Sequence, residues 1–273
     1  MVGYGLRSDG FFATSNVPPS TFEESMIDIK NLHHRYPDGT HALKGINLTI
    51  AKGEFLLICG PNGSGKTTLI RLISGLYKPT DGSILLNGVN GVHTSKEVRR
   101  LIGMVFQDAD SQIVGETVRE DISFGPENMG LPPDKITERV NWALRLMGLE
   151  AVSEKPCYLL SGGEKRRLAI AGVLAMGPEI ILFDEPFSHL DYPAIQEVLR
   201  HLVHLHRQGH TLILTTHDVE KVIAHVDRVA IIHKGELKAA GPPDDIVTKL
   251  SQFGVRPPCY ALLRQERMSW LNE

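Results

Sequence analysis

The chain has 273 residues, of which 42% are hydrophobic, and a formal net charge of −3, so it can bury a large core and has no basic surplus that would indicate nucleic acid as its main partner. Its three cysteines, Cys59, Cys157 and Cys259, are scattered, which argues against a disulfide scaffold or a zinc cluster and suggests a reducing compartment. The sequence has no run of about 18 apolar residues, so no segment is expected to span a membrane.

Residues 1–25 precede the periodic part of the sequence. They lack the basic start and the apolar stretch of a signal peptide. Their Gly, Ser, Thr and Pro content predicts a disordered N-terminal extension. Regular apolar spacing begins at Met26, which makes a start at Met26 an alternative. Residues 26–245 are assigned to one domain, and residues 246–273 to a short C-terminal tail.

Short strands are expected in the first part of this domain. Apolar residues and bounding turns predict strands at residues 26–32, 42–50 and 54–59. The turns between them are supplied by Asp38-Gly39 and Lys52-Gly53.

The third of these strands leads into a glycine-rich segment that is followed by helically spaced apolar residues. The segment has the G-x-x-x-x-G-K-T pattern of a phosphate-binding loop, whose glycines let backbone N–H groups point at phosphate oxygens beside a helix N-terminus. Lys66 can reach the β- and γ-phosphates of a nucleotide, and the Thr67 hydroxyl can ligate Mg²⁺. A tight strand-to-helix turn without a ligand is the alternative. The phosphate-binding residues predicted here are Gly60, Pro61, Asn62, Gly63, Ser64, Gly65, Lys66, Thr67 and Thr68.

A helical region is expected in the middle of the chain, after two more strands at residues 83–88 and 102–106. Residues 108–177 are assigned to a helical subdomain, because residues 136–147 have helical spacing. Breaks between its helices are expected at Pro126, Pro132 and Pro133.

The last helix of this region opens with Ser161, Gly162, Gly163 and Glu164. Ser161 and Glu164 have the spacing of a capping box. The two glycines reduce helix stability, which makes sense if the backbone must approach another group closely. A capped helix start with free N–H groups and a serine hydroxyl can bind an anion. An ordinary capped helix start is the alternative.

Strands return at residues 180–183, 212–215 and 229–232, and their short apolar runs predict a parallel sheet covered on both faces. Asp184 and Glu185 follow the first of these strands, at the edge where ligands bind in open α/β sheets. Asp184 suits Mg²⁺, and Glu185 suits a base that orients or deprotonates an attacking water. A simple acidic turn is the alternative. His217 follows the next strand and is predicted to sense the γ-phosphate, although a surface histidine is also possible there.

Six motifs in this order resemble the ATP-binding-cassette (ABC) ATPases over about residues 26–245. They are the phosphate loop, Gln107, residues 160–163, residues 183–186, residues 188–191 and His217. The resemblance implies an α/β fold: a RecA-like core typical of P-loop NTPases, with an antiparallel β subdomain and an inserted helical subdomain.

The resemblance also implies roles for individual residues. Tyr36 would stack on adenine, and Gln107 would join Thr67 and Asp184 at the Mg²⁺. Residues 161–164 would meet the γ-phosphate held by an opposite subunit, and Asp191 would lie in a loop that crosses the dimer interface. Two positions depart from the family pattern: Glu164 replaces the usual Gln, and His189 replaces a small residue and is expected to face outward.

A narrower resemblance comes from residues 106–115 and 118–128, which are similar to the energy-coupling-factor ATPases, including those of cobalt and nickel import. It implies an ATP-hydrolysing importer subunit for a micronutrient such as cobalt, nickel or a vitamin, on the cytoplasmic face of the cell membrane. Its partners would be a second ABC ATPase chain, a membrane scaffold and a substrate-binding membrane protein. The scaffold would dock on Asp108, Asp110 and Gln112, beside an exposed Ile113-Val114 pair. The alternatives are the ATPase of another ABC importer and a soluble ABC ATPase outside transport.

Overall fold

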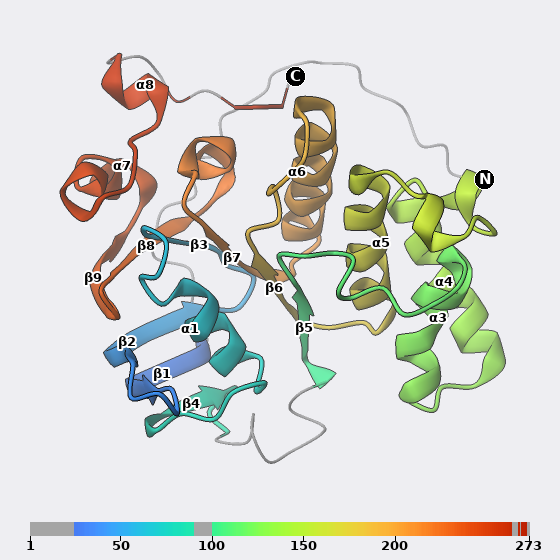
Figure 1. The fold of residues 1–273 in the computed structure, drawn as a ribbon, viewed down its shortest axis with the longest axis horizontal. Helices are drawn as coiled ribbons and strands as arrows, with labels where there is room; N and C mark the ends of the chain where they lie inside the picture. The colour runs from blue at the N-terminus through green and yellow to red at the C-terminus, as the bar shows by residue number, and fades with distance from the viewer. Residues whose placement is uncertain (1–24, 90–99, 264–266, 268, 272–273) are drawn as a thin grey trace, which may run out of the picture.

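The computed structural model describes residues 25–89, 100–263, 267 and 269–271. The predicted N-terminal extension therefore lies outside the described residues, apart from Ser25. The described chain contains a central six-stranded sheet, a smaller three-stranded sheet and a group of helices on the side away from the small sheet (Figure 1).

The central sheet has the strand order β5-β6-β7-β3-β8-β9. All neighbouring pairs are parallel except β8 and β9, which are antiparallel. Its strands are β3 (Phe55–Cys59), β5 (Ile102–Val105), β6 (Ile180–Asp184), β7 (Thr211–Thr216), β8 (Arg228–His233) and β9 (Glu236–Gly241). The predicted parallel sheet is confirmed, with β9 as an additional strand at one edge.

Alternate residues of each central strand point to opposite faces of the sheet. In β3, Phe55, Leu57 and Cys59 belong to one core cluster, whereas Leu56 and Ile58 belong to the other, and all five are fully buried. This is why the strand is a continuous apolar run rather than an alternating one.

The small sheet covers one face of the central sheet. Its strands are β1 (Ser25–Arg35), β2 (His41–Ala51) and β4 (Asp81–Leu86), in the antiparallel order β2-β1-β4. Helix α1 (Lys66–Ile73) contributes Leu69, Ile70, Leu72 and Ile73 to the same apolar cluster. The small sheet and α1 thereby pack together on one face of the central sheet, beside the phosphate loop that leads into α1.

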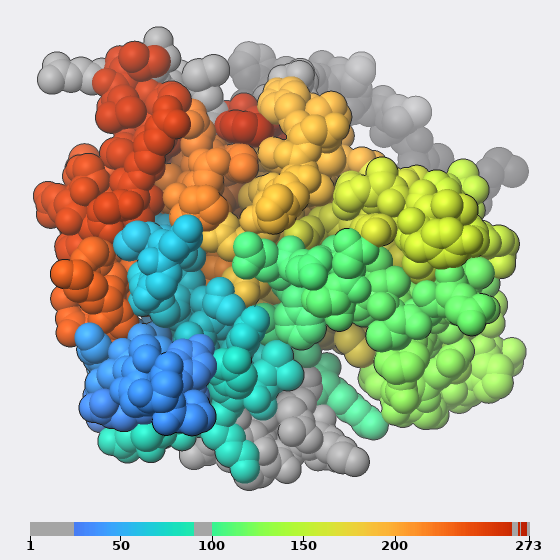
Figure 2. Space-filling view, viewed as in Figure 1, coloured from blue at the N-terminus to red at the C-terminus, as the bar shows by residue number. Residues whose placement is uncertain are grey.

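The other described α-helices are α3 (Val118–Asn128), α4 (Pro133–Leu146), α5 (Gly162–Ala175), α6 (Tyr192–Arg207), α7 (Pro243–Val247) and α8 (Cys259–Leu262). Helices α5, α6 and α7 contact strands of the central sheet, whereas α3 and α4 pack on α5. Single-turn helices lie at Glu150–Val152, Cys157–Leu159, Val219–Lys221, Ile223–His225 and Leu250–Phe253. In the space-filling view, the green to yellow surface of α3, α4 and α5 lies on the side of the molecule away from the blue β1 and β2 (Figure 2).

The predicted fold class is confirmed, but one predicted helix break is wrong. Pro126 lies inside α3 rather than ending it, and its side chain is buried. Pro126 lacks the N–H that would bond to the carbonyl four residues earlier, so the helix loses one backbone hydrogen bond near its end and continues for two more residues. Pro132 and Pro133 do separate α3 from α4, and Pro133 is the first residue of α4. In the described part of the chain, no helix is both long enough and apolar enough to cross a membrane.

Candidate functional site

The phosphate loop, residues 60–68, connects β3 to α1 in a conformation that needs its glycines. Gly63 and Gly65 have positive φ angles of 75° and 109°. A Cβ on Gly60 would lie 2.1 Å from the Ile232 carbonyl oxygen, and one on Gly65 would lie 2.9 Å from that of Ala42. The loop can therefore hold this shape only with glycine at these positions.

Lys66 extends into this loop from the first position of α1. Its residue is 6% exposed, and its amine donates to the carbonyl oxygens of Gly60, at 2.8 Å, and Pro61, at 3.3 Å. Burial lowers the pKa of the amine, while the carboxylates of Glu185 and Asp184 act against that shift. The buried Ser64 hydroxyl has no hydrogen-bond partner among the described residues. A cation and an unpartnered donor in one glycine loop fit a bound phosphate.

Asp184 ends β6 and is 2% exposed. Its Oδ1 accepts from the Thr67 hydroxyl, at 3.0 Å, and from the Thr215 hydroxyl, at 2.8 Å. A carboxylate and a hydroxyl in contact beside the phosphate loop provide the oxygen ligands that Mg²⁺ prefers. The residues present therefore fit the predicted metal ion.

Glu185 is held in place from several directions. Its backbone has a φ of 46°, a left-handed conformation that is uncommon for a residue other than glycine. Its Oε1 accepts from the His217 backbone N–H, at 3.1 Å, and lies 2.9 Å from His217 Nδ1. Its Oε2 accepts from the Thr216 hydroxyl at 2.9 Å, and Lys66 Nζ lies 3.8 Å from Oε1. The structure thus brings Lys66, Glu185 and His217 together.

Lys66, Glu185 and His217 line one cavity of about 650 Å³. Tyr36 and Gln107, expected at adenine and at Mg²⁺, also line it. The Tyr36 hydroxyl lies 2.8 Å from the Thr68 hydroxyl. Among the described contacts, the Gln107 side chain makes no hydrogen bond to Thr67 or Asp184. The cavity also includes three basic residues that the sequence did not single out, His41, Lys44 and Lys234.

The segment of residues 161–164 lies at a different place. Its predicted capping box is confirmed: the Ser161 hydroxyl accepts from the Glu164 N–H at 3.2 Å, and Glu164 Oε2 accepts from the Ser161 N–H at 2.7 Å. A second cavity, of about 380 Å³, is lined by residues 161–164 together with Arg167, Leu190, Pro193, Ala194, His189, Asp191 and Glu197. No described residue lines both this cavity and the one at the phosphate loop.

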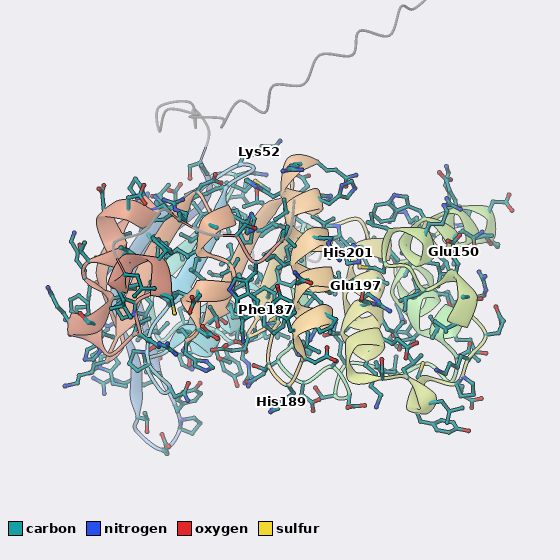
Figure 3. The ribbon with its side chains drawn as sticks, turned by 90° about the horizontal axis from the view of Figure 1, so that it is seen from above. Lys52, Glu150, Phe187, His189, Glu197 and His201 are labelled. Atoms are coloured by element: carbon teal, nitrogen blue, oxygen red, sulfur yellow. The ribbon has the colours of Figure 1, made fainter. Side chains whose placement is uncertain are left out.

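Asp191 and His189 line the second cavity from the segment before α6, and His189 is labelled there in Figure 3. Asp191 caps α6, since its side chain accepts from the Ala194 N–H at 3.1 Å. His189 is exposed, as expected, and has a φ of 61°. The start of α5 and the start of α6 therefore face one opening.

The segment expected to dock the membrane scaffold is more internally bonded than the sequence suggested. Asp110 accepts from Lys165 at 2.5 Å. The Gln112 side chain accepts from the Phe106 N–H and donates to the Met104 carbonyl, so it holds the loop together. The expected exposure of Ile113 is wrong, because that side chain packs on the core, whereas Val114 is 61% exposed.

A third cavity, of about 720 Å³, lies beside this segment, between β5, α3 and α5. We call it the α3–α5 groove. Its lining includes the exposed side chains of Val114 and Phe124, together with Met129 and Met176. Asp121 lies at its wall and holds the loop, since its Oδ1 accepts from the Val114 N–H at 2.7 Å. Phe124 was missed because nothing local to α3 indicates which side chains the fold leaves uncovered.

Comparisons with known proteins agree with this geometry. The family model of ABC transporters matches residues 43–188. The energy-coupling factor transporter ATP-binding protein EcfA of Methanocaldococcus jannaschii is 43% identical over 224 residues, which cover 81% of this chain and 80% of that protein.

Solved structures agree as well. The structure of cbiO1 from Clostridium perfringens, part of the ABC transporter complex cbiONQ, matches with a TM-score of 0.77 and 38% identity, covering 89% of this chain and 99% of that one. The dimeric structure of the ATP-binding cassette MJ0796 in a post-hydrolysis state, bound to ADP and Pi, matches with a TM-score of 0.72 and 31% identity, covering 80% and 99%. The chain belongs to the ABC transporter family, and it is an ATP-binding subunit with ATPase activity.

Proposed function

We propose that the chain is the ATP-hydrolysing subunit of an energy-coupling-factor importer, which drives uptake of a micronutrient such as cobalt, nickel or a vitamin. It acts as a dimer, with a second copy of itself or with a related ABC ATPase chain, and two ATP molecules lie between the chains. Substrate recognition resides in a separate membrane protein. The relatives named above support the importer class, and the internal arrangement of the site supports the dimer.

One observation supports the proposed dimer. The phosphate loop, Glu185 and His217 line one cavity, while Ser161 and Gly163 line another with no described residue in common. Both sets can bind phosphate, by a glycine loop in the first case and by a capped helix start in the second. Pairing two chains about a two-fold axis would bring the second cavity of each chain to the first cavity of the other. A two-fold dimer then has two identical composite sites.

The residues of the first cavity suit hydrolysis. The Lys66 amine holds the γ-phosphate oxygens, and Glu185 accepts a proton from the attacking water. His217 keeps the Glu185 carboxylate oriented through the contact of its Nδ1 with Oε1. Thr67, Asp184 and Gln107 would hold Mg²⁺, which when bound neutralises charge on the phosphate oxygens. Tyr36, which lines the same cavity, would stack on the adenine ring of ATP.

The α3–α5 groove is the proposed dock of the membrane scaffold. Val114 and Phe124 are 61% and 52% exposed, and uncovered apolar side chains in one groove indicate a partner surface. Gln112 also lines the groove and is bonded to Phe106, next to Gln107, so the dock adjoins the Mg²⁺ site. Asp108 and Asp110, which precede Gln112 in the same loop, would extend the dock. With the groove on the scaffold, the chain would lie peripherally on the cytoplasmic face of the membrane.

The composite site is tested by mixing two inactive variants. Ser161→Arg blocks the second cavity, and Lys66→Ala disables the phosphate loop. In a mixed dimer the first chain supplies the loop and the second supplies Ser161, so one site of two is whole. Random pairing makes half of the dimers mixed, so hydrolysis should recover to about a quarter of the wild-type rate.

The two variants alone should remain inactive. Absence of recovery while mixed dimers are detected by tagged co-purification would contradict the composite site.

A further inference from the structure

Three consecutive basic residues follow the Ser-Gly-Gly-Glu start of α5, and each contacts a different segment. Lys165 Nζ lies 2.5 Å from Asp110 Oδ1. Arg166 reaches the backbone just after β5. Arg167 pairs with Glu197 of α6, the helix that Asp191 caps, and Glu197 is labelled on that helix in Figure 3. The helix that carries Ser161 is thereby attached both to the loop of Gln107 and to the helix of Asp191.

Arg166 makes the least expected of these contacts. The residue is 3% exposed, and its guanidinium donates through Nη1 to the Phe106 carbonyl, at 2.6 Å, and through Nη2 to the Gln107 carbonyl, at 2.5 Å. The guanidinium is planar and its donors are fixed in a fork, so two bonds to adjacent carbonyls set both the position and the orientation of that backbone. The side chain of Gln107 projects from this same backbone into the cavity of Lys66 and Glu185.

The contact is electrostatically unusual. No carboxylate of the described residues lies within ion-pair distance of Arg166, and its buried Nε has no hydrogen-bond partner there. Burial lowers the pKa of the guanidinium, and the negative charges of Asp108 and Asp184 act against that shift. A buried cation held by two neutral carbonyls and left with an unused donor is an unfavourable way to stabilise a fold. Its geometry, in contrast, is well suited to holding a loop.

We propose that Arg166 is a positioning residue, which fixes the Gln107 backbone so that the Gln107 side chain faces the reacting phosphate of its own chain. The inference rests on the proposed role of Gln107 in hydrolysis. The same backbone is tied to the proposed dock, because Gln112 bonds to the Phe106 N–H while Arg166 bonds to the Phe106 carbonyl. A shift of the dock therefore moves the segment that Arg166 holds against α5.

The chain offers a matched control at the other end of α5. Arg139 of α4 donates from Nη1 to the carbonyls of Ala175, at 3.2 Å, and Met176, at 2.9 Å. Like Arg166, it sets a guanidinium on two adjacent carbonyls, but these carbonyls lie at the end of α5 and not beside Gln107. Arg139→Gln and Arg166→Gln each remove two bonds to adjacent carbonyls, so a kcat loss confined to Arg166→Gln would reflect the position of its bonds beside Gln107.

The first test measures steady-state hydrolysis by the full chain. Arg166→Gln should lower kcat by about 10- to 100-fold, the effect of a small misplacement of a positioned group, with KM for ATP unchanged because the phosphate loop is intact. Arg139→Gln should keep kcat. Arg166→Lys should fall between wild type and Arg166→Gln, since one amine can serve one carbonyl. A wild-type kcat in Arg166→Gln, or equal losses in Arg139→Gln, would overturn the inference.

The second test asks which site Arg166 serves. In a mixed dimer of Arg166→Gln and Lys66→Ala chains, the intact phosphate loop lies beside the displaced Gln107, while Ser161 and an intact Arg166 come from the other chain. Hydrolysis should not recover above that of Arg166→Gln alone. Recovery equal to that of the Ser161→Arg and Lys66→Ala pair would show that Arg166 acts through Ser161 and would overturn the inference.

The composite site and the positioning role of Arg166 can be refuted independently of each other. If the Ser161→Arg and Lys66→Ala pair does not recover, the composite site is wrong, and the kcat and KM comparison still decides the role of Arg166.

Discussion

Replacing Glu185 with Gln separates the chemistry of the site from its stability. The change removes the proposed base but keeps the shape of the side chain. Oε1 can still accept both contacts from His217, and the new amide faces the Thr216 hydroxyl, which can accept from it. Because these hydrogen bonds persist, the free energy of unfolding should change by about 1 kcal/mol or less.

The catalytic effect should be much larger. Loss of a general base lowers turnover by about 10²- to 10⁴-fold, which raises the barrier by about 2.7–5.4 kcal/mol. The contacts of Lys66 with the loop carbonyls do not involve Glu185, so ATP binding should persist. The magnitudes predict a variant that folds and binds ATP but does not turn it over.

The assay compares steady-state phosphate release with the Tm of the same preparations. Glu54→Gln is the control, since Glu54 is 2% exposed and lies 2.9 Å from Arg228 Nε, away from the nucleotide cavity. Weakening that buried contact should cost about 1–3 kcal/mol of stability and leave turnover per folded chain intact. Near-wild-type turnover by Glu185→Gln would refute the assignment of the base.

The remaining predictions concern binding, docking and pH. Lys66→Ala should weaken ATP binding by about 1.5–3 kcal/mol, measured by calorimetry, and an unchanged Kd would mean that the loop does not bind phosphate. Val114→Arg should reduce co-purification with the membrane scaffold, whereas Arg at Leu76, which is 56% exposed outside the α3–α5 groove, should not; equal co-purification would exclude the groove as the dock. Burial lowers the pKa of His201, so below a pH of about 6.5 the unfolded chain takes up a proton that the folded chain resists. The free energy of unfolding should therefore fall as pH falls through that value, and His201→Leu should show a shallower slope in denaturant titrations from pH 5.5 to 7.5; an identical slope would exclude His201 as a contributor.

Features that depend on a few neighbouring residues were predicted from the sequence. The phosphate loop needs glycine where φ is positive or where backbones approach closely, as at Gly65 and Gly60. The capping box depends only on Ser161 and Glu164. Asp184 and Glu185 follow a buried apolar strand, so their place at the sheet edge follows from the strand itself. The catalytic roles of these residues remain predictions.

Features set by distant contacts were not predicted. Strand β9 pairs with β8 at the sheet edge, but its half-exposed sequence, Glu236–Gly241, has no apolar run. Ile113 was expected to be exposed because polar Ser111 and Gln112 precede it, yet its side chain packs on the core. The bond of Arg166 to Gln107 joins residues 59 positions apart. No local pattern indicates such a contact, because it depends on how α5 packs beside β5.

Packing also placed groups in the nucleotide cavity that no motif indicates. His41 and Lys44 come from β2, and Lys234 lies in the turn between β8 and β9. They reach the phosphate loop because the small sheet packs over α1 and the end of β8 lies beside Gly60. The domain boundaries at residues 25 and 245 likewise remain predictions, as do the limits of the helical subdomain.

The central claim is that hydrolysis requires two chains. The most direct test measures the rate of ATP hydrolysis per chain and the molar mass of the same sample, by light scattering, over a series of protein dilutions with ATP and Mg²⁺. The account predicts that the rate per chain falls as the mass falls from twice 30.2 kDa toward 30.2 kDa. A full rate per chain from a species of 30.2 kDa would contradict it.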